Sequence, residues 1–165
     1  MHFNLAQTFY VDKSLVQNAD DIILTSIDLY FKSKPRDTNN QSGIEKPGVN
    51  IYLAPVKEGD IPNIDDMFKD SHVRLEYDDI VVGGLNAKTN FKFKQPIDIL
   101  TNKSYAVVIA FDGQEDFALW TAKEGDIIYG TNISATGSME KNVGKLYEYS
   151  SHVATPPISL SLIHI

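Results

Sequence analysis

Apolar and polar residues alternate with a period of two along much of this chain, and this pattern limits what the chain can fold into. Alternation places one face of an extended strand on a core and the other in water, which is typical of antiparallel β-structure. The alternating stretches lie at residues 27–32, 49–53, 73–77 and 91–94. Residues 105–111 are apolar throughout and predict a central strand buried on both faces. Further strands are expected at 4–11, 117–121 and 144–149.

Turn-forming residues separate these stretches, among them Pro47-Gly48, Gly59-Asp60 and Gly83-Gly84. A short helical stretch is expected at 64–69, with Asn63 as its N-cap. The chain has 165 residues, which suits one domain. About eight strands bounded by turns predict an all-β fold, an antiparallel two-sheet β-sandwich with a jelly-roll-like topology.

The last six residues, LSLIHI at 160–165, are what CTG TCT CTT ATA CAC ATC would encode. This string resembles the transposon-end adapter of sequencing libraries. We therefore expect residues 1–159 to form a single sandwich domain that is a fragment of a larger protein. Residues 160–165 are then a non-native, adapter-derived tail; the alternative is a genuine apolar final strand.

The charge balance argues against several classes of partner. The net charge is −7, and the basic residues are scattered along the chain, so a phosphate backbone would be repelled and no nucleic-acid partner is expected. No apolar run approaches the length of a membrane span, and no secretory signal is expected at the start. Cysteine is absent, which excludes thiolate metal sites and cysteine nucleophiles.

The motifs of known enzyme classes are missing, and we expect no enzymatic activity. The chain has no G-x-S-x-G elbow, no H-E-x-x-H, no P-loop and no G-x-G-x-x-G. No histidine spacing suggests a zinc site, and His72, at the start of an alternating strand, is expected on the surface. No catalytic residue and no cofactor is predicted.

Calcium is the one metal worth considering, because carboxylates in a loop at the rim of a sandwich can supply oxygen ligands. The candidate ligands are Asp112, Glu115 and Asp116. No D-x-D-x-D-G pattern supports them, and solvated turns use the same residue types, which is the favoured interpretation.

Aromatic side chains offer a possible carbohydrate site, since the C–H faces of sugars pack on aromatic rings. Trp120 and Tyr52 are the candidate stacking residues, with Tyr30, Tyr77 and Tyr129 as further platforms. The alternation places Trp120 on the strand face opposite Phe117 and Leu119. The favoured alternative is that Trp120 packs in the core of the sandwich or at a subunit interface.

The order of several segments resembles a known virion domain. These are AQTFYV at 6–11, LTSIDLYFKSKP at 24–35, PGVNIYL at 47–53, GDIP at 59–62, TNFKF at 89–93, PI at 96–97, KSYAVVI at 103–109, LWT at 119–121, GD at 125–126 and GKLY at 144–147. Over residues 5–150 the chain resembles a β-sandwich domain of contractile-tailed bacteriophage virion proteins, found in baseplate wedge and tail-fibre-like components.

This resemblance implies a non-catalytic structural and interaction role in the virion, in a phage tail or baseplate. The implied partners are other virion proteins or further domains of the same chain. The alternative is a carbohydrate-binding module, used in attachment to a cell-surface glycan or appended to a secreted enzyme.

Overall fold

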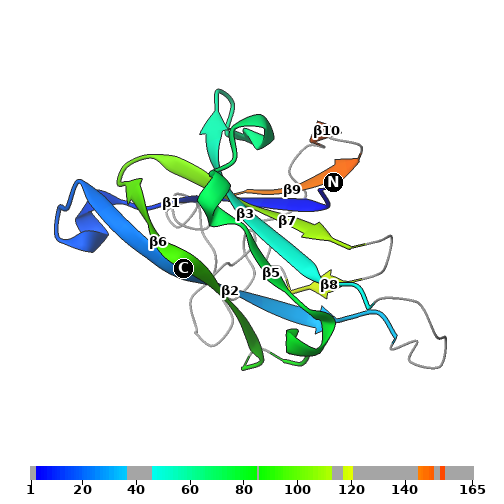
Figure 1. Ribbon diagram of the computed structural model, residues 1–165. Coiled ribbons are helices and arrows are strands. Elements are labelled where there is room, and N and C mark those ends of the chain that lie inside the picture. The colour runs from blue at the N-terminus through cyan, green and yellow to red at the C-terminus, as the bar shows by residue number, and fades with distance from the viewer. Residues whose placement is uncertain are drawn as a thin grey trace.

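The computed structural model describes residues 3–36, 46–84, 86–112, 117–120, 145–150 and 153–154. Its strands form two antiparallel sheets that face each other (Figure 1). The seven-stranded sheet has the order β10-β9-β1-β7-β3-β4, and β5 also pairs with β3. Its strands are β1 (Leu5–Tyr10), β3 (Val49–Lys57), β4 (Ile61–Pro62), β5 (Val73–Leu75), β7 (Ser104–Phe111), β9 (Leu146–Ser150) and β10 (Val153–Ala154). The three-stranded sheet has the order β6-β2-β8 and comprises β6 (Lys88–Leu100), β2 (Asp21–Ser33) and β8 (Ala118–Leu119).

The predicted all-β two-sheet sandwich is confirmed. Three of its strand pairs are nested along the chain: β1 with β9, β2 with β8, and β3 with β7. Nested antiparallel pairs are what a long hairpin folded over on itself produces, as in a jelly roll. Other pairs within the two sheets are β1–β7 and β2–β6. The short strand β5 pairs with β3.

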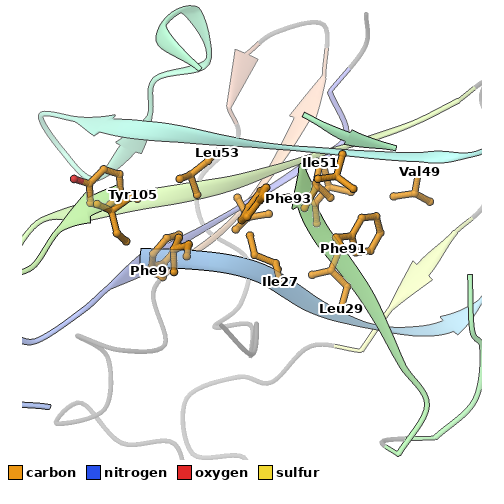
Figure 2. Close-up of a cluster of buried hydrophobic side chains, with 14 of the residues drawn as sticks. Phe9, Ile27, Leu29, Val49, Ile51, Leu53, Phe91, Phe93 and Tyr105 are labelled. Carbon is orange, nitrogen blue, oxygen red and sulfur yellow. The ribbon is translucent and has the colours of Figure 1, made fainter. Parts of the chain in front are cut away.

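The main core lies between the two sheets, where side chains from β1, β3 and β7 meet those from β2 and β6 (Figure 2). Ile27, Phe31, Val49, Ile51 and Phe91 are completely buried there. Each comes from a stretch in which apolar residues alternate with polar ones. The period of two therefore fixes which face of each strand points inward.

The outward face of the seven-stranded sheet is also buried at its centre. Ala6, Ala54, Val108 and Ala110 form a second cluster there with Tyr147 and other residues. As predicted, β7 is therefore buried on both faces. Small side chains on three adjacent strands leave room for the larger rings that cover them.

Two expectations need correction in detail. The helical stretch at 64–69 is two separate 3-10 turns, η2 (Ile64–Asp66) and η3 (Lys69–Ser71), and Asn63 makes no side-chain cap bond to the backbone. Two further 3-10 turns are η1 (Lys13–Val16) and η4 (Tyr77–Asp79). The strand at 27–32 extends to Asp21–Ser33, and a shift in register between Leu24 and Ser26 hides its first half from a simple period of two.

Several expectations concern residues outside the described part of the chain. The suspected tail at 160–165 lies outside it, as do Glu115 and Asp116. In the described residues, no helix is long and apolar enough to cross a membrane.

Candidate functional site

Asp112, the first calcium candidate, lies at the end of β7, where its carboxylate joins three segments. Its Oδ2 accepts a hydrogen bond from the backbone N–H of Gly48 at 3.1 Å and pairs with Arg74 Nη1. Its Oδ1 accepts from Asn50 Nδ2 at 3.0 Å. Burial alone would raise the pKa of Asp112, but the bonds from Arg74, Gly48 and Asn50 outweigh it and the pKa is lowered.

Arg74 extends this network along β5. Its Nε and Nη2 donate to the two carboxylate oxygens of Glu76 at 2.9 and 3.1 Å, and these bonds, with those to Asp112, raise the pKa of the guanidinium. Arg74 thus bridges two carboxylates, an arrangement that suits the planar fork of its donors.

His72 stands at the other end of the network, and it is half-buried rather than on the open surface. Its Nε2 lies 2.8 Å from Asn50 Oδ1. Its ring stacks on Tyr52, with 4.6 Å between centroids and 9° between planes. Because Asn50 gives its amide hydrogens to Asp112, its oxygen faces His72, and this assigns the proton of the neutral imidazole to Nε2. Burial lowers the pKa of His72, and the charges of Lys94 and Arg74 lower it further.

This polar network has a structural role that its geometry explains. Asn50 and Tyr52 alternate with the core residues of β3, so they point to the outward face of the seven-stranded sheet. The four polar contacts of Asn50 and Asp112 described above are all made within this chain, with Gly48, Arg74, His72 and each other. A calcium ion at Asp112 would have to replace these bonds, and the described residues contain no group of three or more His, Cys, Asp or Glu side chains that could hold a metal.

Tyr52, the other candidate stacking residue, packs against two aromatic rings. One face of its ring is covered by His72, and the ring of Phe3 meets it edge-on at 6.2 Å. The ring therefore belongs to the packing on the outward face of this sheet.

Trp120 is different, because it lies on the other sheet and 37% of it is exposed. It follows β8 directly, and its backbone N–H donates to the carbonyl of Tyr30 on β2 at 2.9 Å. Its indole Nε1 donates to the carbonyl of Gly83 at 2.8 Å, and Lys32 Nζ lies 5.3 Å from the ring centroid. Trp120 therefore does not pack in the core of the sandwich, one of the two places favoured for it from sequence. The other place, a subunit interface, stays a prediction.

The register of the three-stranded sheet places polar side chains beside Trp120. Tyr30 faces Lys88 across β2 and β6, and the next outward pair is Asp28 with Asn90. Asn90 Nδ2 donates to Asp28 Oδ1 at 2.6 Å, and Lys88 Nζ lies 3.4 Å from Asp28 Oδ2. The sequence showed the alternation of β2 and β6 separately, but not the register that brings these residues together.

A hollow of about 270 Å³ lies between the start of the chain, the β3–β4 hairpin and β9. Phe3, Ile61, Pro62 and Tyr149 line it. The hydroxyl of Tyr149 is buried and has no hydrogen-bond partner in the part of the chain described here. Burial, with a smaller contribution from Tyr147, raises the pKa of Tyr149 to about 12. Because this hydroxyl is shielded from solvent, a molecule in the hollow would not contact it in the observed conformation of Tyr149.

A scan against protein-family models, a search of curated proteins and a search of solved structures found no match to this chain. The function is therefore argued from the geometry and chemistry of these surfaces.

Proposed function

We propose that this chain is a non-catalytic structural and interaction module of a phage tail or baseplate protein. Its proposed location is the virion, where it docks on other virion proteins or on further domains of its own chain. The order of segments quoted in the sequence analysis suggests a phage virion as the location. The exposed apolar residues around Gly83 are the observation that supports docking on another protein.

Val81, Val82 and Trp120 are all exposed and large, and they gather at one end of the three-stranded sheet. Val82 forms an isolated bridge with Phe31 of β2, and the next residue, Gly83, accepts the indole hydrogen bond of Trp120. Apolar residues that gather on a surface are typical of protein–protein contacts.

The DNA on either side of the coding sequence tests the setting. Neighbouring genes for sheath, tube or baseplate proteins are expected. Neighbours that encode metabolic or secreted enzymes would rule out the virion role.

The docking role is tested by co-expressing the chain with the products of those neighbouring genes and following co-elution in size-exclusion chromatography. We expect co-elution that is lost in the double variant Val81→Ser/Val82→Ser. The variant Ile23→Ser, which changes an exposed apolar residue in the other half of β2, should retain it. Equal co-elution of all three proteins would contradict docking at this surface.

Carbohydrate binding is the second candidate function, and the anchoring of Trp120 favours it. An exposed indole held by a hydrogen bond from its own Nε1 presents a fixed apolar ring next to Tyr30. A fixed ring loses little conformational freedom when a sugar stacks on it, which favours binding.

A further inference from the structure

The outward face of the three-stranded sheet combines two aromatic residues with lysines in a chain that is acidic overall. Trp120, Tyr30 and Lys88 form one row across β8, β2 and β6, because Trp120 bonds to the Tyr30 carbonyl and Tyr30 is in register with Lys88. Asp28 and Asn90 form the next row, and Ser26 with Lys92 the third.

The charge of this face is opposite to that of the whole molecule. Among the described residues in and beside these rows, Lys32, Lys88 and Lys92 carry three positive charges and Asp28 carries one negative charge, whereas the whole chain carries −7. In the part of the chain that the structure describes, the next acidic residues of β2 and β6 on this face are Asp21 and Asp98, and they lie beyond the shift in register of β2. A basic face of this kind attracts an anionic group even on an acidic protein.

We propose that this face binds an acidic saccharide, one whose sugar rings carry carboxylate or sulfate groups. The inference deepens the second candidate function and rests on it. Sugar rings stack on Trp120 and Tyr30, and the acidic groups lie toward Lys32 and Lys92. Asn90, which is exposed, offers amide groups that hydrogen-bond to the sugar hydroxyls.

A saccharide fits this face better than single-stranded nucleic acid, although both combine stacking with negative charge. Asp28 lies beneath the middle of the face and is 7% exposed. Its carboxylate repels phosphates that pass over the middle of the face, whereas the hydroxyl groups of a sugar ring can lie there with the acidic groups of the saccharide toward Lys32 and Lys92.

The face is also organised before any ligand arrives. Trp120 is held through Gly83, and Asp28 is held by Asn90 and Lys88 at 2.6 and 3.4 Å. A binding surface with side chains already fixed has less conformational entropy to lose on binding.

The test is a glycan array that contains carboxylated, sulfated and neutral oligosaccharides of matched length, with oligo(dT) as a nucleic-acid probe. We expect binding to acidic glycans that weakens as the salt concentration rises from about 0.05 to about 0.5 M. Affinity for the glycan that binds best should fall at least about tenfold in Trp120→Ala and in Lys32→Gln/Lys92→Gln. Circular dichroism and thermal melting establish that each variant is folded.

Two exposed residues elsewhere provide matched controls. Leu15→Ala removes an exposed apolar side chain from η1, and Lys69→Gln removes a positive charge from η3. Both variants should bind as the parent chain does. Equal losses in the controls would show that binding is not located on this face and would overturn the proposal.

The outcomes separate the two levels of the inference. Binding of neutral glycans that is lost in Trp120→Ala and unaffected by the lysine variant would retain carbohydrate binding but overturn the acidic class. Binding of oligo(dT) alone would replace the saccharide by nucleic acid. No binding to any glycan would overturn both this inference and the second candidate function.

Discussion

Among single residues, the charge state of His72 should affect folding near neutral pH. Because its pKa is lowered in the folded chain, the fold favours the neutral imidazole. The associated stability is present above the ordinary histidine pKa of about 6.5 and is lost as the pH falls toward the folded value. We therefore expect the parent chain to lose stability between about pH 7 and pH 5, and His72→Gln to lose less over the same range.

Urea unfolding of both proteins at the two pH values measures this difference. The comparison with His72→Gln removes the effect of every other titrating group that the two proteins share. A stability difference between the two proteins that stays constant with pH would show that His72 does not titrate as its surroundings imply.

Tyr147 and Tyr149 provide a matched pair on β9. The Tyr147 hydroxyl donates to the carbonyl of Asp60 at 2.9 Å, whereas the buried Tyr149 hydroxyl has no partner in the described residues. We expect Tyr147→Phe to lower the free energy of unfolding by about 0.5–1.5 kcal/mol, as for an ordinary hydrogen bond. Tyr149→Phe should leave it unchanged or raise it by up to about 1 kcal/mol, because it removes a buried unpaired group. A large loss in Tyr149→Phe, measured by thermal or urea unfolding, would show that this hydroxyl is paired.

At the scale of the strands, Gly48, which directly precedes β3, lies so close to β5 that there is no room for a side chain at this position. A Cβ on Gly48 would lie 2.8 Å from Arg74 Cζ and 2.8 Å from the carbonyl oxygen of Leu75. The backbone atom of this pair cannot rotate away, so Gly48→Ala must move β5 and disturb the bonds of Arg74 to Asp112. We expect a loss of stability of about 1–3 kcal/mol.

Gly84→Ala is the control, because a Cβ at Gly84 meets nothing within 4 Å. Its midpoint of thermal unfolding should be close to that of the parent chain. If both substitutions cost the same, the close approach of Arg74 to Gly48 is not what constrains this position.

The strands also show what the sequence could and could not predict. The period of two located β3, and a continuous apolar run located β7, because both patterns follow directly from which strand faces are buried. These patterns missed β4 and β10, which have two residues each and so contain no repeat. They could not give the register that joins Trp120 to Tyr30, since pairing between distant strands is set by the whole fold. The same reason hid the contact of His72 with Asn50, 22 residues away along the chain.

At the scale of the whole molecule, the two sheets share one core and should unfold together. Leu53 of β3 is completely buried and belongs to the cluster that joins side chains of both sheets. Trp120 is the one tryptophan in the sequence and lies next to the three-stranded sheet, so its fluorescence reports on the sheet that does not contain Leu53. Leu53→Ala leaves a cavity and should cost about 2–5 kcal/mol.

If the core couples the two sheets, this substitution should lower the unfolding midpoint measured by Trp120 fluorescence as much as the midpoint measured by far-ultraviolet circular dichroism. The expected decrease is about 2–4 °C for each kcal/mol lost. Leu15→Ala, which changes a side chain exposed on η1, should leave both midpoints in place. A fluorescence midpoint that stays unchanged while the circular dichroism midpoint falls would mean that the three-stranded sheet unfolds on its own. The face proposed to bind the saccharide would then be independent of the seven-stranded sheet.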